Sequence, residues 1–437
     1  MAASTAGASA IEDRTSPFVA AADEVAAGGR AVIILVALFL VSAFSQIDRI
    51  LPFILAEMIK AELSLSDTQI GLLTGIAFAV VYALLSLPLA RAADWGSPRL
   101  VLISCILVWS AMTGLGGVAA SFLFLTVTRF GVALGEAGAT PSAHALIART
   151  ISPERRGLAI GIFSMGIPLG TMAGFALGGT LGDTLGWRSV LFGAGAIGGL
   201  IAVLVVAATK PTPPRSRAAI ASEPFLRASL RLLTSPGFRW LIVSAMLAGF
   251  AGAPFYAFAA PFLIRVHGLT AGEAGIAFGL LQGLMGILGT MLGGRWFDRS
   301  VAAGHGRLLG PPAILFLLSS ATVTAALFTP IAWLSVALLV PTMLSFSFLL
   351  PWSFGTGHLV AGRGSEAMAS SLGMIGSGLL GPALGPLFVG MASDAATAAQ
   401  IPNGLSYGLL IVPLASALTG LALLVANRRV ADVLRRR

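Results

Sequence analysis

The sequence has 437 residues, of which 57% are hydrophobic and 10% are charged, and its formal net charge is +9. Soluble globular proteins carry about 25% charged residues, so this composition predicts an all-α polytopic membrane protein. Its apolar residues form continuous runs, whereas the strands of a membrane β-barrel would alternate polar and apolar residues. The basic residues lie in short loops between the runs, a pattern that indicates membrane topology and argues against nucleic acid as a partner.

Twelve apolar runs are each long enough to cross a bilayer as a helix, which takes about 20 residues. They lie at about 31–58, 68–90, 99–119, 121–148, 156–181, 187–208, 238–265, 271–294, 307–328, 331–358, 366–391 and 404–427.

The order of these runs predicts five parts of the chain. Residues 1–29 have no apolar core and cleavage site of a signal peptide, so we interpret them as a cytoplasmic tail. A first six-helix bundle at 30–208 and a second at 237–428 are separated by a cytoplasmic linker at 209–236, in which a short amphipathic surface helix is expected. Residues 429–437 form a basic cytoplasmic tail.

The distribution of lysine and arginine predicts the orientation. With twelve spans, 22 of the 27 basic residues fall on the side of the two termini and only Lys60, Arg188 and Arg265 on the other. By the positive-inside rule, both termini are then cytoplasmic, as expected for a bacterial inner membrane protein.

An internal repeat relates the two predicted bundles. The segments around Gly71 and Gly275 are similar, as are those around Asp94 and Asp298, and both pairs are 204 residues apart. Two six-helix halves in parallel orientation explain this offset, and such repeats place the substrate site at their interface near the middle of the membrane.

Four strongly ionisable residues are predicted near the middle of the membrane. Asp48 and Arg49 interrupt the first run, and Arg129 and Glu136 interrupt the fourth. Each charge there costs about 2.5–3.5 kcal/mol on the translocon scale, so such residues indicate function by default. Because Arg129 and Glu136 are two helical turns apart on one face, the four residues can form a crossed network if the two helices are neighbours. The alternative is a static ion-pair cluster.

The loop after the second run resembles the Major Facilitator Superfamily. The segment Ala90–Arg99 stands where this superfamily has a Gly-x-x-x-Asp-Arg-x-Gly-Arg-Arg loop, although Ala90 replaces the first glycine and Trp95 and Ser97-Pro98 interrupt the basic cluster. These departures predict a weaker cytoplasmic charge latch than is usual in the superfamily.

Two further matches to superfamily motifs are shorter, and a third match is to one family within the superfamily. Gly166-Ile-Pro-Leu-Gly170 partly matches the antiporter motif Gly-Pro-x-x-Gly, and Gly186-Trp-Arg188 is common in the superfamily. More narrowly, Asp48-Arg49 with Leu51-Pro52, joined to Arg129-x-x-x-x-x-Gly-Glu136, resembles bacterial spinster-family members. These are relatives of transporters that carry sphingosine-1-phosphate and lysophospholipids. The resemblance implies the major facilitator fold and alternating access.

We assign each ionisable residue a role on this basis. Glu136 is the expected main proton carrier, and Asp48 is coupled to it. Arg49 is the expected anchor for an anionic headgroup, because guanidinium binds phosphate or carboxylate through two hydrogen bonds. Arg129 is expected to bind substrate as well and to compete for the two acids. His144 and His358 lie on helices, where a lone histidine is more often packed than protonically active.

Aromatic residues and charged residues in the cytoplasmic loops complete the expected site. In the seventh run, Phe255, Tyr256 and Phe258 are expected to contact the apolar part of the substrate. Ordinary packing is the alternative for each of them. At the cytoplasmic ends of the two halves, four charged residues are expected to act in gating, with the two acids capping a facing helix N-terminus when that side closes. These residues are Arg91, Asp94, Arg295 and Asp298.

The sequence therefore predicts a proton-coupled secondary transporter, working as a monomer, for an amphipathic lipid-like or lysolipid-like substrate. It has no nucleotide-binding loop, no metal-ligand spacing and no catalytic constellation, so we expect neither an enzyme nor a cofactor or metal. The alternatives are a proton-driven exporter of hydrophobic drugs or organic anions, and an uncoupled membrane sensor or lipid scramblase.

Overall fold

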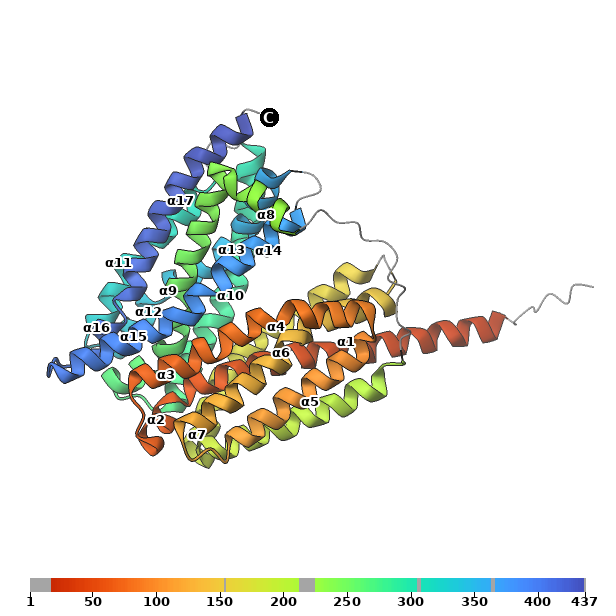
Figure 1. Cartoon of the computed structure of the whole chain (residues 1–437), viewed down its shortest axis with the longest axis horizontal. Helices are drawn as coiled ribbons and strands as arrows, with labels where there is room; N and C mark the ends of the chain where they lie inside the picture. The colour runs from red at the N-terminus through yellow and green to blue at the C-terminus, as the bar shows by residue number, and fades with distance from the viewer. Residues whose placement is uncertain (1–16, 153–154, 212–224, 305–307, 363–365, 436–437) are drawn as a thin grey trace, which may run out of the picture.

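The computed structural model describes residues 17–152, 155–211, 225–304, 308–362 and 366–435, and all the regular secondary structure in these ranges is helical. The helices form two bundles that meet at one end and diverge toward the other (Figure 1). We call the end where the described termini and the basic loops lie the inner end, and the opposite end the outer end.

The N-terminal bundle is built from seven helices, with one break inside the last of them. They are α1 (Pro17–Ile54), α2 (Ala56–Leu63), α3 (Asp67–Thr74), α4 (Ile76–Trp95), α5 (Pro98–Gly116), α6 (Phe122–Thr150) and α7 (Arg156–Ala208). The break is at Gly186, whose φ of 77° and ψ of 154° are not helical. Its positive φ suits glycine, which has no Cβ.

The C-terminal bundle follows a short helix, α8 (Phe225–Thr234), in the linker. Its helices are α9 (Pro236–His267), α10 (Ala271–Ala302), α11 (Gly310–Phe328), α12 (Ala332–Leu338), α13 (Val340–Ala361), α14 (Glu366–Gly378), α15 (Leu380–Ala398), α16 (Gly404–Gly408) and α17 (Ile411–Arg435). Helix α8 lies against this bundle, because Leu232 is buried in a cluster with Phe238 of α9.

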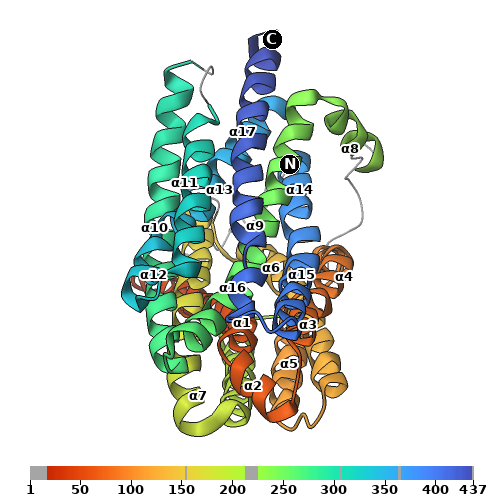
Figure 2. The ribbon, with the colours of Figure 1, turned by 90° about the vertical axis from the view of Figure 1, so that its left-hand side faces the viewer.

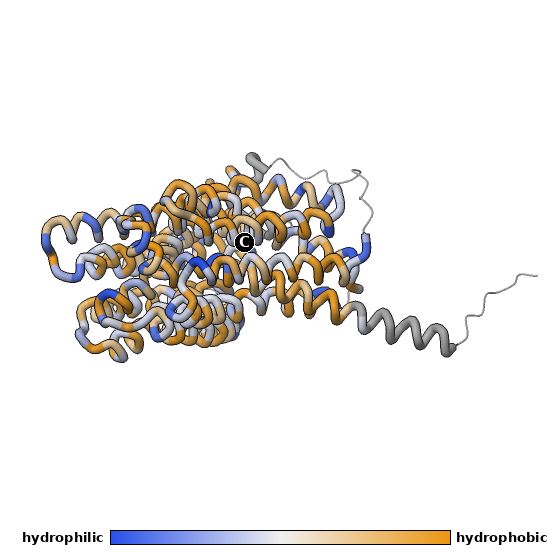
Figure 3. The backbone as a smooth tube through the Cα atoms, turned by 90° about the horizontal axis from the view of Figure 1, so that it is seen from below, coloured by the Kyte–Doolittle hydropathy of each residue, from blue (hydrophilic) through white to orange (hydrophobic). Residues whose placement is uncertain are grey.

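The helices account for twelve membrane spans, as predicted. Eleven stretches of the described chain are long and apolar enough to cross a membrane, and one of them, Arg156–Ala208, holds two spans separated by Gly186. Apolar residues line the helices and hydrophilic ones gather mainly toward their ends (Figure 3). Only structures that satisfy all backbone hydrogen bonds internally can cross the bilayer core, which is why these runs are helical.

Several predicted spans are divided more finely than the sequence indicated. The first span ends at Ile54 rather than 58, and the second is divided between α3 and α4 at Gly75. The eleventh is divided between α14 and α15 at Leu379.

Arginines at the inner end satisfy helix C-terminal carbonyls. Arg149 donates to the backbone oxygens of Ala93 and Asp94 at 3.1 and 2.7 Å, at the end of α4. Arg99 donates to the oxygens of Val206 and Thr209 at 3.0 Å each, at the end of α7. These carbonyls have no partner within their own helices and carry partial negative charge, so a cation there is stabilising.

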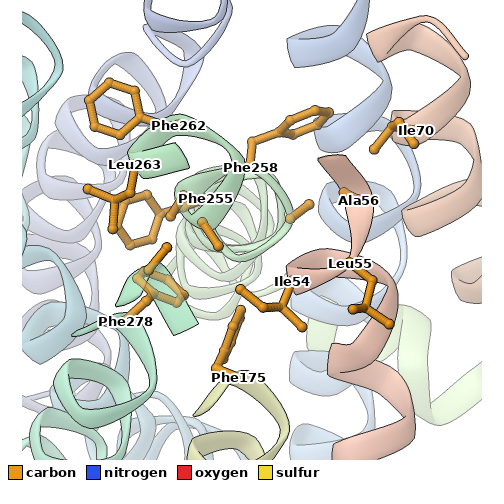
Figure 4. Packing of buried hydrophobic residues seen from close by; sticks show 14 of the residues in the cluster. Ile54, Leu55, Ala56, Ile70, Phe175, Phe255, Phe258, Phe262, Leu263 and Phe278 are labelled. Carbon is orange, nitrogen blue, oxygen red and sulfur yellow. The ribbon is translucent and has the colours of Figure 1, made fainter. Parts of the chain in front are cut away.

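The apolar cores show how the two bundles are arranged. One buried cluster contains residues of both halves, including Leu55 and Phe175 with Phe255, Phe258 and Phe278 (Figure 4). At the inner end each half has a buried cluster of its own. Helix α15 lies beside α3, and α10 packs on α7 (Figure 2). The outer ends of the halves are therefore packed together, while their inner ends are apart.

Candidate functional site

The structure brings together the four ionisable residues predicted in mid-membrane, which we call the central cluster: Asp48, Arg49, Arg129 and Glu136. Arg49 on α1 donates to Glu136 Oε2 on α6 through Nη2 at 2.7 Å and Nε at 3.1 Å. The Glu136 side chain is completely buried, whereas 29% of the Arg49 side chain is exposed. Arg49 is therefore the member of this ion pair that a substrate can reach.

Asp48 is bound to a hydroxyl rather than to a cation. Its Oδ2 accepts a hydrogen bond of 2.5 Å from Thr113 Oγ1 on α5, and both residues are buried. Its Oδ1 is buried without a hydrogen-bond partner, and so is Oε1 of Glu136. Thr113 was not among the predicted site residues, although a threonine in an otherwise apolar span was a usable indication.

Arg129 is buried, and none of the described carboxylates forms an ion pair with it. Within the described part of the chain no ion pair is formed by this residue, and its Nε lacks a hydrogen-bond partner. The predicted crossed network is therefore half formed in this structure, with the Arg49–Glu136 pair present and no pair between Arg129 and Asp48.

Two stacked aromatic rings on α4 lie under the guanidinium groups. The Phe78 and Tyr82 ring centres are 5.6 Å apart with an interplanar angle of 21°. The Arg49 guanidinium carbon is 4.6 Å from the Phe78 ring centre and 5.0 Å from that of Tyr82. The Arg129 guanidinium carbon is 5.3 Å from the Phe78 ring centre. Cations attract ring faces at these distances. Phe78 thus contacts both guanidinium groups, a role that the sequence analysis missed.

A small cavity adjoins the central cluster. It has a volume of about 20 Å³ and is lined by Thr113, Thr128 and Arg129, among other residues. This is enough for one water molecule, and the lining offers polar partners for it.

The three aromatic residues predicted to contact substrate belong to the C-terminal half. Phe255 and Phe258 are buried, with 2% and 0% of their surfaces exposed, in the core shared by both halves. Tyr256 is partly exposed and lies 5.9 Å from Phe346 between ring centres. In this conformation Tyr256 is the one of the three with accessible surface, because the packed outer ends cover the other two.

The four predicted gating residues make no contact between the halves in the described structure. Arg91 and Asp94 at the end of α4, and Arg295 and Asp298 near the end of α10, are all exposed. Neither acid caps a facing helix here, because the inner ends of the halves are apart (Figure 1). Their role stays a prediction for a state with the inner end closed.

The outer end is closed by what we call the outer ion-pair group: Glu57, Lys60, Asp67 and Arg265. Arg265 on α9 donates to both oxygens of Glu57 at 2.6 and 3.0 Å and to both oxygens of Asp67 at 2.8 and 2.7 Å. Lys60 binds Asp67 at 2.5 Å. Lys60 and Arg265 served only to predict the topology, although basic residues so rare on the predicted outer side pointed to specific partners.

The comparisons with known proteins agree with this architecture. Residues 34–386 match the Major Facilitator Superfamily. The chain belongs to this superfamily. An MFS-type efflux pump of Mycolicibacterium smegmatis is 34% identical over 386 residues, which are 88% of this chain and 89% of the pump.

Solved structures lead to the same family. A bacterial homologue of the human lysosomal transporter Spinster, in an inward-facing and unoccupied conformation, has a TM-score of 0.79 and 29% identity, covering 93% of this chain and 97% of the homologue. A D-xylose–proton symporter shares the fold, with a TM-score of 0.68, 16% identity and coverage of 90% and 97%. The predicted resemblance to bacterial spinster members is confirmed, and the family is one of membrane transporters rather than enzymes.

Proposed function

We propose that this protein is a proton-coupled secondary active transporter of an amphipathic, lipid-like or lysolipid-like molecule, and that it works by alternating access. Glu136 is the main proton carrier, with Asp48 coupled to it. Arg49 binds the anionic headgroup, and Arg129 competes for the acids and contributes to substrate binding. The protein lies in the bacterial inner membrane as a monomer, and both of its termini are in the cytoplasm.

The observation that carries this proposal is the incomplete pairing of the central cluster. Buried charges are strongly disfavoured unless they are paired and hydrogen-bonded. Here Glu136 Oε1, Asp48 Oδ1 and Arg129 Nε are all buried without a hydrogen-bond partner. A static ion-pair cluster would be expected to satisfy these groups. Groups that exchange protons and partners during a cycle must each lack a partner in some state, so the observed pairing favours a working site.

The asymmetry between the halves supports the class of substrate. The central cluster lies in the N-terminal half, on α1 and α6, while α9, α10 and α13 of the other half contribute an aromatic group with Tyr256, Phe278 and Phe346. A molecule with an anionic head and an apolar body can contact both. An arginine such as Arg49 also suits a phosphate or carboxylate head.

The test is transport by the purified full-length protein in vesicles with an imposed pH gradient, with fluorescent lysophosphatidate as the probe. We expect accumulation of the probe against its gradient, abolished by a protonophore. Glu136→Gln should reduce this accumulation to the level of protein-free vesicles. Glu273→Gln, which removes an exposed carboxylate at the start of α10, is the matched control and should transport normally. Full proton-driven transport by Glu136→Gln would refute the assignment of Glu136.

One alternative is favoured by a specific observation, the similarity to an efflux pump. An exporter of hydrophobic drugs would accumulate a drug-like dye such as ethidium rather than lysophosphatidate in the same vesicles. An uncoupled scramblase would equilibrate the lipid without accumulation and would be insensitive to the protonophore.

A further inference from the structure

Helices α3 and α10 begin in the same way at repeat-equivalent positions. The N-cap residues are Ser66 and Thr270, which are 204 residues apart. Each side chain accepts a hydrogen bond from the backbone N–H three residues later, at Gln69 and Glu273, and each of these side chains accepts one from the N-cap backbone N–H. Both helices therefore start at the outer end with a complete local capping box.

Each helix start is capped a second time, by a carboxylate of the opposite half. Asp394 on α15 accepts from the backbone N–H groups of Asp67 and Thr68 at 2.9 and 2.8 Å, and from the Thr68 hydroxyl at 2.6 Å. Asp183 on α7 accepts from the backbone N–H of Gly272 at 2.7 Å. Thr68 and Gly272 again differ by 204 residues, so the two caps bind equivalent positions of the repeat.

The carboxylates themselves occupy equivalent positions. Asp183 and Asp394 are 211 residues apart, and each follows a glycine by four residues, or about one helical turn. These glycines, Gly179 and Gly390, lie where the helices of the two halves cross. A Cβ atom at either one would lie 2.2 Å from a backbone oxygen of the opposite half, that of Ala271 or Asp67 respectively. The glycine permits the close approach, and the aspartate one turn later reaches the helix start.

We propose that Asp183 and Asp394 are a matched pair of positioning residues that hold the outer ends of the two halves together in this inward-open state. The first N–H groups of a helix lack partners within the helix and carry partial positive charge, so a carboxylate stabilises them. Both contacts cross between the halves, and both are lost when the outer ends separate. The pair therefore biases the conformational equilibrium toward outer closure, whatever the protein transports.

The hydrogen bonds predict that the two aspartates contribute unequally to holding the outer ends together. Asp394 accepts from three donors and Asp183 from one. Asp394 is also half-buried, whereas Asp183 is exposed. Removing Asp394 should therefore favour outer opening more than removing Asp183.

The experiment measures how often the shared outer core opens. Ala274 on α10 is fully buried in that core, so the rate at which a maleimide labels an Ala274→Cys reporter reports outer opening, provided that the one native cysteine, Cys105, is replaced by alanine in every variant. We expect Asp394→Ala to raise this rate about tenfold and Asp183→Ala about threefold. Their effects should multiply in the double variant if both act on one equilibrium. Asp394→Asn keeps an acceptor oxygen and should have a smaller effect than Asp394→Ala.

Two controls separate this role from loss of folding. Ala133→Cys places a reporter in the buried core of the N-terminal half, and its labelling should be unchanged by both substitutions. Glu273→Gln alters only the local capping box of α10 and should leave the Ala274→Cys rate unchanged. Unchanged labelling in both aspartate-to-alanine variants would overturn the proposal, and so would equal acceleration of the two reporters.

Discussion

The central cluster and the outer ion-pair group have the same composition, two acids and two bases, but they are paired differently. In the outer group, Glu57 and Asp67 each use both carboxylate oxygens, and Arg265 uses all three guanidinium nitrogens. In the central cluster, one oxygen of each acid and one nitrogen of Arg129 are buried without a partner.

The two groups also differ in what they connect. The outer group links α2 and α3 of the first half to α9 of the second, while the central cluster lies within the first half. A fully satisfied group that joins two bodies holds one conformation. An incompletely satisfied group within one body has capacity left for a proton or a substrate. If the proposed function is right, pairing rather than the presence of charge distinguishes the outer ion-pair group, which joins the halves, from the central cluster, which takes part in transport. The following substitutions test this difference.

The largest effect is expected from Arg265→Gln. It leaves Glu57 without its cation and Asp67 with Lys60 alone, and it removes the two ion pairs by which Arg265 joins the halves. Removing one partner of a buried pair costs about 3–5 kcal/mol, and partial exposure of the Arg265 side chain, 29%, reduces this to roughly 2 kcal/mol. The Ala274→Cys labelling rate should rise about 30-fold, since about 1.4 kcal/mol corresponds to a factor of ten.

Arg188→Gln is the matched control for this substitution. Arg188 is also an outer arginine with a single carboxylate partner, Glu62 at 3.0 Å, but both residues belong to the first half. It should leave the labelling rate nearly unchanged. Equal effects of the two substitutions would show that the outer ion pairs stabilise the fold in general and do not specifically hold the two halves together.

A smaller effect is expected from Thr113→Val, which removes the hydrogen bond to Asp48 while preserving shape. A hydrogen bond to a charged group contributes about 1.5–3 kcal/mol, so proton-driven uptake of lysophosphatidate should fall at least about tenfold. Outer labelling should not change, because the central cluster lies within one half. Thr128→Val is the control: its hydroxyl also lines the small cavity but donates within its own helix, to Leu125 O at 2.8 Å. Normal uptake by Thr113→Val would exclude Asp48 from the mechanism.

The sequence predicted the features that depend on hydropathy and spacing. Twelve spans follow from the length of the apolar runs, and the approach of Arg49 to Glu136 follows from the cost of leaving either one alone in the membrane. The 204-residue repeat predicted two halves, and the equivalent helix starts at Ser66 and Thr270 preserve it in the structure.

The missed residues depend on which helices become neighbours, which one sequence does not specify. Thr113 acquires its importance when α5 brings it to Asp48, and Arg265 when α9 packs against α2 and α3. Nothing in the sequence indicated the role of Asp394 either, because its partners lie more than 300 positions away in the chain. The gating role of the four residues at the inner end stays a prediction, because the inner ends of the halves are apart in this structure.

The smallest effect is expected from Phe78→Leu, which removes the ring that both guanidinium groups contact but keeps an apolar side chain. Arg49 and Arg129 each lose a cation–π contact of roughly 0.5–1 kcal/mol. We expect the KM for lysophosphatidate to rise about threefold, with outer labelling unchanged. Phe78→Tyr retains a ring face, so its KM should equal that of the unsubstituted protein. A role that depended on side-chain volume alone would not predict this result. If leucine and tyrosine gave the same KM, the contact of the ring with the two guanidinium groups would be ordinary packing.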